Sequence, residues 1–286
     1  MTKIPGRVEI TSFPKGKRIA VTTSFDDGDE CDRRVVAAFN EWGLKGTFNL
    51  NSGKLGVSGI RPPDGSRQKI DRSEVADLYR GHEVAIHTVT HPHLEKLDPS
   101  QIALEVLEDR KALEDLVGYP VRGMAYPFGS YDSRVVEILR TLGIVYCRTC
   151  HVAGPCFPPA DPLLWATTGH QYVENPSIPE QFAKLYANPR YSGVFYVWGH
   201  AYEFHDRKDW AALERIFKPL SGKPDVWYCT NIELFDYEEA RKRMIVAANR
   251  ASAHNPSALT VTLNVDGELV DVAGGQTVSL TKPAKG

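Results

Sequence analysis

Short apolar runs alternate along the chain with segments whose apolar residues recur at helical spacing. Strands are predicted at residues 18–25, 45–50, 83–88, 122–127, 144–148, 194–199 and 226–230. Helices are predicted between them at residues 31–42, 71–81, 99–117, 132–142, 179–187 and 209–217. Strands that alternate with helices indicate βα units, and seven or eight such units in one chain favour a barrel. We therefore expect an α/β fold, a (β/α) barrel of about seven units.

The C-terminal part of the chain follows a different pattern. Residues 258–280 alternate between apolar and polar positions with a period of two, around the dipeptide Asp266-Gly267. This alternation predicts strands, and Asp-Gly is typical of a tight hairpin turn. We predict a barrel over residues 1–250 and a small β-strand appendage over residues 256–286.

Charge and composition exclude several classes of protein. The 286 residues include 34 Lys and Arg against 36 Asp and Glu, a net charge of −2, so the chain has no field that would attract nucleic acid or an anionic membrane. No apolar run approaches the ~18–20 residues that span a bilayer. The five cysteines and the absence of an apolar leader in the first residues predict reduced thiols and a cytoplasmic protein. The composition and charge are also compatible with an oligomer.

Residues with metal-binding and acid–base chemistry follow the predicted strands. Asp26 and Asp27 end the first strand, His87 and His91 follow the third, and His200 ends the strand at 194–199. A barrel places its active site at the C-terminal ends of its strands, so these side chains are expected at one mouth. Two histidines and one carboxylate form a metal site with positions left for water and substrate.

The two aspartates are adjacent, so in an extended strand their side chains would point in opposite directions. A bend at the strand end would bring both to one site in separate roles, one as a metal ligand and one in proton transfer. The His87–His91 spacing resembles that of zinc proteases, but Thr88 stands where those enzymes need a glutamate. A thermolysin-like peptidase is therefore excluded.

The order of these segments resembles the polysaccharide deacetylase (NodB-like carbohydrate esterase) family. The resemblance rests on Ser24-Phe-Asp-Asp-Gly28, His87-Thr-Val-Thr-His91, Tyr126-Pro-Phe-Gly129 and a late strand that ends at His200, and it covers about residues 18–236. It implies a deformed barrel that uses a divalent metal to remove N-acetyl or O-acetyl groups from sugars.

The resemblance also implies a role for each matching residue. Asp26 matches the general base and His200 the general acid, whereas Asp27, His87 and His91 match the metal-binding triad, with Zn²⁺ as the expected ion. Phe128 stands where the family uses a backbone N–H to hold the oxyanion. Tyr126, Phe128 and Trp198 are the expected substrate-binding residues.

The chain departs from the family pattern at two positions, so the residues that would fill these two roles must be sought elsewhere in the sequence. Ala125 occupies the position where much of the family has an arginine that orients the base. We predict that Arg148, at the end of the next strand, binds Asp26 instead through a planar guanidinium. The alternative is that Arg148 binds solvent or a loop carboxylate such as Asp161. The partner of His200 is also open, with Asp161, Glu203 and Asp206 as candidates.

The sequence thus favours a metal-dependent deacetylase that acts on an N-acetylated sugar or oligosaccharide. One alternative is a hydrolase of another non-peptide C–N bond, such as a cyclic ureide or imide, on the same scaffold. The other is a non-catalytic glycan-binding protein. Intact base, triad and acid positions favour the enzyme.

Overall fold

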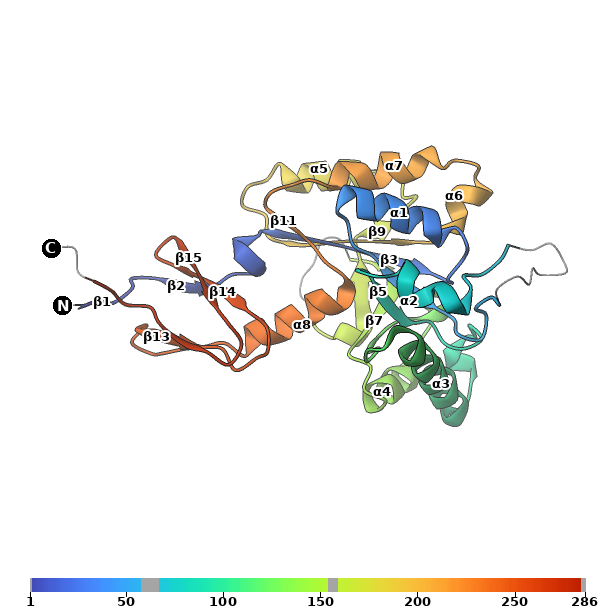
Figure 1. The fold of residues 1–286 in the computed structure, drawn as a ribbon, viewed down its shortest axis with the longest axis horizontal. Coiled ribbons are helices and arrows are strands. Elements are labelled where there is room, and N and C mark those ends of the chain that lie inside the picture. Colours follow the sequence, from blue (N-terminus) through green and yellow to red (C-terminus); the bar gives the residue numbers. More distant parts are fainter. Residues whose placement is uncertain (1, 58–66, 154–158, 284–286) are drawn as a thin grey trace.

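The computed structural model describes residues 2–57, 67–153 and 159–283, and its main body is a barrel of parallel strands (Figure 1). In the described residues the sheet has nine strands, in the order β8-β7-β6-β5-β4-β3-β10-β9, with β11 also paired to β3. The strands are β3 (Ile19–Asp26), β4 (Thr47–Leu50), β5 (Glu83–Ile86), β6 (Gly123–Ala125), β7 (Tyr146–Val152), β8 (Trp165–Thr167), β9 (Gly169–His170), β10 (Gly193–Gly199) and β11 (Val226–Tyr228).

One chain segment closes the barrel. Strand β8 pairs with β7, and β9, which follows after the single residue Thr168, pairs with β10 at the other end of the sheet. Thr168 itself donates a backbone hydrogen bond of 2.8 Å to the carbonyl of Tyr196 in β10. The register between β7 and β8 shifts between Arg148 and Val152, which deforms the ring. The predicted α/β class and deformed barrel are confirmed.

Helices cover the outside of the barrel, with α1, α5 and α7 on one side and α3 and α4 on the opposite side in Figure 1. The α-helices are α1 (Asp32–Trp42), α2 (Val75–Leu78), α3 (Pro99–Val117), α4 (Ser133–Thr141), α5 (Ile178–Tyr186), α6 (Tyr202–Asp206), α7 (Ala211–Phe217) and α8 (Asn231–Lys242). None of the helices in the described part of the chain has the length and apolar content needed to cross a bilayer.

Local sequence explains where the longest helix begins and ends. The Asp98 side chain accepts hydrogen bonds from the backbone N–H groups of Ser100 and Gln101, and Gln101 completes a capping box. Gly118, with a φ of 75°, ends the helix in the left-handed conformation. The predicted bounds of this helix, 99–117, are those observed.

Two predicted elements differ clearly from the structure, and one long helix was missed. Strand β7 continues four residues beyond Arg148, because β8 supplies a partner for this extension. The helix predicted at 71–81 is a 3₁₀ turn (Arg72–Glu74) followed by the short α2. Helix α8 was not predicted. The loop predicted at 51–70 includes residues 58–66, which lie outside the described residues.

The N-terminus of α8 closes the floor of the barrel. The backbone N–H of Asn231 donates to Thr47 Oγ1 at 3.0 Å, and that of Ile232 donates to Glu83 Oε2 at 2.9 Å. The Asn231 side chain accepts from Thr22 Oγ1 at 2.7 Å. The partners Thr22, Thr47 and Glu83 are buried, so the first N–H groups of the helix find their acceptors inside the barrel.

The appendage combines both ends of the chain. The strands β14 (Val261–Val265) and β15 (Glu268–Val272) form a hairpin across Asp266 and Gly267, both with positive φ, as predicted. Strand β2 (Val8–Ile10) pairs with β14. A second sheet joins β12 (Ile245–Val246), β13 (Ser252–His254) and β16 (Thr277–Ser279), and β1 (Thr2–Lys3) pairs with β17 (Lys282–Pro283). Residues 8–10 and 245–254 thus share sheets with the tail.

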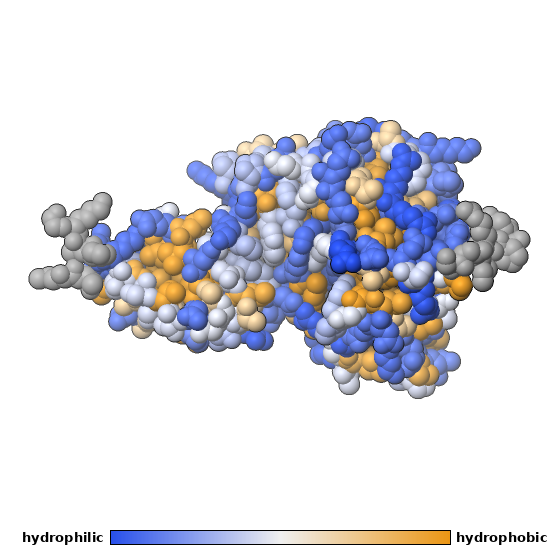
Figure 2. Space-filling view, viewed as in Figure 1, coloured by the Kyte–Doolittle hydropathy of each residue, from blue (hydrophilic) through white to orange (hydrophobic). Residues whose placement is uncertain are grey.

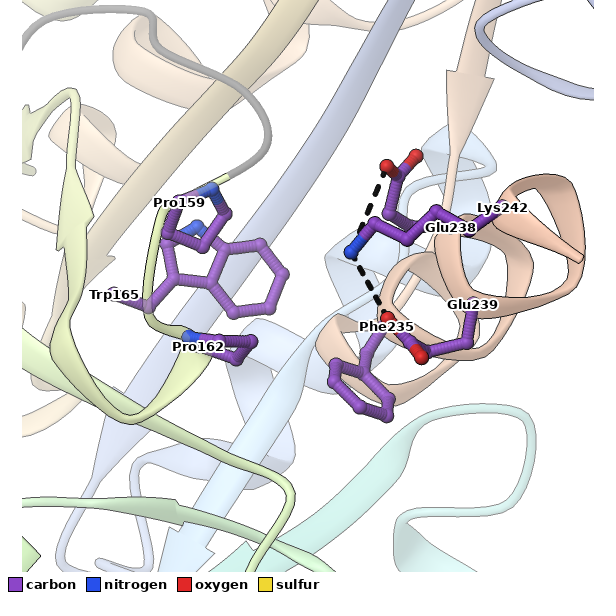
Figure 3. A pocket seen from close by; sticks show the side chains of 7 residues that line it. All are labelled: Pro159, Pro162, Trp165, Phe235, Glu238, Glu239 and Lys242. Carbon is purple, nitrogen blue, oxygen red and sulfur yellow. Dashed lines mark hydrogen bonds and ion pairs between the residues drawn. The ribbon is translucent and has the colours of Figure 1, made fainter.

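The appendage lies at the end of the barrel where the strands begin. Figure 1 shows both chain ends there, and Figure 2 shows hydrophobic residues gathered over the appendage on the same face. Figure 3 shows a small pocket on this side, where Phe235 of α8 faces Pro162 and Trp165. Trp165 packs edge-on against Tyr146 and Tyr196 in the barrel floor, so it is a core residue.

Candidate active site

A cavity of about 360 Å³ lies at the C-terminal ends of the barrel strands. It is lined by Asp26, Asp27, His87, His91, Tyr126, Phe128, Gly129, Cys150, Trp198, His200 and Tyr202. Every site residue predicted from the sequence is in this set except Arg148, which lies directly behind Asp26. The structure therefore gathers residues from β3, β5, β6, β7 and β10, which are far apart in the sequence, at one barrel mouth.

A bend at the end of β3 brings both aspartates to the cavity. Asp26 is the last residue of the strand, and Asp27 and Gly28 both have positive φ, 79° and 57°. This turn removes the alternation that would otherwise point the two carboxylates to opposite faces. Thr88, His91 and Phe128 around the same cavity also have positive φ, of 69°, 63° and 58°. Backbone strain of this kind is concentrated at functional sites.

Asp27, His87 and His91 form a three-residue cluster whose ligand atoms all lie within 4.8 Å of one another. The Nε2 atoms of His87 and His91 lie 3.8 and 3.6 Å from Asp27 Oδ1. Ligands about 2.1 Å from a tetrahedral zinc ion are separated by about 3.4 Å, so small movements would complete the site. Burial lowers the pKa of His87, and it lowers the pKa of His91 to about 4, so both rings are neutral at pH 7.

The hydrogen bonds of His87 leave the correct nitrogen free. Its Nδ1 lies 2.8 Å from the carbonyl oxygen of Ala125, an acceptor only, so Nδ1 carries the proton and Nε2 offers its lone pair to the cavity. The backbone N–H of His87 donates to the buried Asp109 carboxylate at 3.0 Å. Asn51 donates from Nδ2 to the carbonyls of His87 and Thr88, at 2.5 and 3.0 Å. The loop that carries both histidines is thereby fixed.

Asp26 is buried and bound by two side chains. Arg148 donates from Nη2 to Oδ2, and Asn49 donates from Nδ2 to Oδ1 at 2.8 Å. Burial alone would raise the pKa of the Asp26 carboxyl, but Arg148, together with His87 and His200, holds that pKa below its usual range. Asp26 is therefore ionised and fixed in orientation.

The hydrogen bond that we predicted between Arg148 and Asp26 is present, although it uses one nitrogen and is not bidentate. The fully buried guanidinium stacks on Trp198, 4.6 Å from the ring centroid, and its Nη1 lies 3.5 Å from Cys150 Sγ. Asp161, the alternative partner, instead pairs with Arg140 at 2.8 Å. The contribution of Arg148 to catalysis stays a prediction.

His200 is hydrogen-bonded to Glu203, one of its three predicted partners. Its Nδ1 lies 3.2 Å from Glu203 Oε1, and its Nε2 lies 4.0 Å from Asp26 Oδ2. Burial would lower the pKa of His200, but Glu203 and Asp26 outweigh burial and raise it. The proton is thus held on a ring whose Nε2 faces Asp26 across the cavity.

The three predicted substrate-binding residues line the cavity in different ways. Tyr126 is fully buried and its hydroxyl donates to the carbonyl of Leu163 at 3.0 Å. Trp198 has one face on the Arg148 guanidinium. Phe128 is 58% exposed and stacks on His93 with ring centroids 4.0 Å apart. Phe128 is therefore the aromatic surface most available to a ligand.

The sequence reasoning missed Asn49 and Cys150. Asn49 is the penultimate residue of β4, a position near the strand end that could have marked it, whereas Cys150 reaches the cavity on the part of β7 that extends beyond the predicted strand. Cys147 and Cys150 lie on opposite faces of β7, because Cys147 packs in the core and Cys150 lines the cavity. Cys156 lies outside the described residues.

Three comparisons relate the chain to known proteins. The polysaccharide deacetylase family model matches residues 14–147. Over 139 residues the chain is 30% identical to a peptidoglycan-N-acetylglucosamine deacetylase of Listeria monocytogenes, which covers 47% of this chain and 27% of that protein. Over 160 residues it is 29% identical to a chitooligosaccharide deacetylase of Rhizobium leguminosarum, covering 55% of this chain and 62% of that protein.

The structural comparison extends over more of the chain. A polysaccharide deacetylase homologue from Mycobacterium smegmatis superposes with a TM-score of 0.60 and 18% identity, over 84% of this chain and 96% of that protein. This likeness shows the fold alone. The chain spans less than two thirds of the length of the two curated relatives. The polysaccharide deacetylase family model thus matches residues 14–147, which bears out the resemblance drawn from the sequence motifs.

Proposed function

We propose that this protein is a metal-dependent hydrolase that removes the N-acetyl group from a sugar or oligosaccharide. The observation that carries the proposal is the convergence, in one cavity, of an ionised Asp26, the cluster of Asp27, His87 and His91, and His200. The named activities of the two curated relatives support the same reaction type.

The donor atoms of the triad suit a divalent transition metal ion. Two neutral imidazoles and one carboxylate are ligands that Zn²⁺ prefers, and three protein ligands leave positions for water and substrate. The Nδ1–H of His87 is already bound to the Ala125 carbonyl, as is usual for a metal-ligating histidine. A cation held there would polarise the acetyl carbonyl and lower the pKa of a bound water.

In this proposal Asp26 accepts the proton of the attacking water. The carboxylate stays ionised because Arg148 binds it, and Asn49 fixes its second oxygen. Its Oδ2 lies 3.9 Å from His87 Nε2, next to the triad. The base is therefore within one water molecule of the metal ligands.

In this proposal His200 protonates the leaving amine. An amine leaves poorly unless it is protonated, so an acid must face the base across the reacting carbon. The Nε2 of His200 points toward Asp26, while Glu203 holds the opposite nitrogen of the ring. The backbone N–H of Phe128 is the proposed donor to the oxyanion, by its position in the family motif.

The test is acetate release from a panel of N-acetylated sugars by the zinc-loaded protein. Wild type should release acetate, and Asp26→Asn should lose about 10²–10⁴-fold in turnover while it keeps its metal. A comparable loss of turnover in His200→Ala would support the role of His200 as the acid. Absence of acetate release from every sugar, with cleavage of a cyclic ureide or imide, would favour the alternative C–N hydrolase. Glycan binding without turnover would favour a non-catalytic protein.

A further inference from the structure

A second cluster of metal-ligand side chains lies beside the proposed active site. His170 is the last residue of β9, His200 follows β10, and Glu203 lies in the first turn of α6. Their ligand atoms all lie within 4.8 Å of one another. Glu203 is shared, because Oε1 lies 3.2 Å from His200 Nδ1 and Oε2 lies 3.2 Å from His170 Nε2.

The shape and charge of this cluster suit a cation. The separations of 3.2 Å approach the spacing of about 3.4 Å between the ligands of a tetrahedral zinc ion. Gln171 donates from Nε2 to Glu203 Oε2 at 2.9 Å and so holds the carboxylate in place. The side chains of His170, His200 and Glu203 are 27%, 20% and 21% exposed, which leaves a path for an ion from solvent.

We propose that His170, His200 and Glu203 bind a second divalent metal ion, and that Zn²⁺ in excess of the first site inhibits the enzyme by occupying this one. Nδ1 of His200 can hold either a proton or a metal ion. A metal ion there displaces the hydrogen bond to Glu203 and prevents the ring from carrying protons on both nitrogens. His200 is then no longer an effective proton donor from Nε2. The inhibition rests on the proposed function, whereas the binding does not.

Metal binding is measured first, without reference to activity. Metal-depleted protein is dialysed against Zn²⁺ or Co²⁺ and the bound metal is counted. Wild type should bind two ions, the second more weakly, and His91→Ala should retain the second site. His170→Ala and His170→Asn should lose the weaker ion, with affinity reduced by about tenfold or more. The control His205→Ala removes an exposed histidine of the same helix and should bind like wild type.

Inhibition is then measured as the ratio of acetate release with one equivalent of Zn²⁺ to release with excess Zn²⁺, within each variant. The zinc concentration for half inhibition should rise about tenfold or more in His170→Ala and stay unchanged in His205→Ala. A single bound ion in wild type at excess zinc, or equal inhibition of His170→Ala and wild type, would overturn the proposal. Two bound ions without any acetate release would uphold the second site and contradict the proposed function.

Discussion

Replacing Arg148 with methionine should leave the buried Asp26 carboxylate without its cationic partner. The two side chains are 0% and 4% exposed, and the variant would leave a buried carboxylate whose remaining side-chain donor is Asn49. Removal of one partner of a buried ion pair typically costs about 3–5 kcal/mol. Since one pKa unit corresponds to about 1.36 kcal/mol, the pKa of Asp26 should rise by about 2–4. The base would then become protonated closer to neutral pH.

Two measurements follow from this estimate. The free energy of unfolding in urea, measured at neutral pH with a chelator present so that no cation replaces the guanidinium, should fall by about 3–5 kcal/mol. The acid limb of the pH profile for acetate release should move to higher pH, because a raised pKa keeps Asp26 protonated to higher pH. For Arg148→Lys, the unfolding free energy and the position of the acid limb should lie between those of Arg148→Met and wild type, because lysine keeps the charge and loses the planar geometry.

Arg122→Met is the matched control. Arg122 also pairs with an aspartate, Asp236, but at the opposite end of the barrel, where its side chain is 32% exposed. Exposed pairs contribute about 1 kcal/mol or less, so this variant should keep nearly full stability and an unchanged pH profile. If Arg148→Met and Arg122→Met lost equal stability, or if Arg148→Lys kept wild-type turnover, the role assigned to Arg148 would be wrong.

Three further outcomes are expected. His87→Ala should lose the tightly bound metal ion, as measured by elemental analysis. Glu203→Gln should move the basic limb of the pH profile to lower pH. Glu203 raises the pKa of His200, and the protonated acid is lost as the pH rises through that pKa. Because the glutamine amide is neutral, it would remove part of this increase in the pKa of His200. Asn231→Ala should reduce the free energy of unfolding by about 1–3 kcal/mol in a urea titration, because it leaves buried hydroxyls such as that of Tyr196 without their partner.

Periodicity predicted the barrel because its signals are local. Helix 99–117 carries its own cap and stop, and the hairpin at Asp266 and Gly267 carries its own turn, so both could be located from a few adjacent residues. Strand β8 and the extension of β7 stabilise each other across the sheet, and β8 has too few residues for any pattern to show. Such elements depend on partners that are distant in sequence.

The candidate site was also predictable only where a local motif marks the residues. Asp26, Asp27, His87, His91 and His200 were found because motifs give residue types and spacing. The choice of Glu203 over two other carboxylates required coordinates, because it depends on the direction in which α6 leaves β10. A cytoplasmic location and Zn²⁺ as the bound metal stay predictions, and the sequence does not identify the sugar.

The barrel interior explains how Asp26 keeps its orientation although Ala125 replaces the family arginine. Asn49 Nδ2 joins Asp26 Oδ1 to Ser24 Oγ, at 2.8 and 2.7 Å. Asn231, at the start of α8, donates to the Tyr196 hydroxyl. Buried polar side chains hold one another at both levels, beside the proposed base and at the helix that closes the floor. Because an unpaired buried polar group is costly, Asn49 is held by Ser24 and in turn orients Asp26, while Arg148 from the neighbouring part of the barrel supplies the charge that the missing arginine would bring.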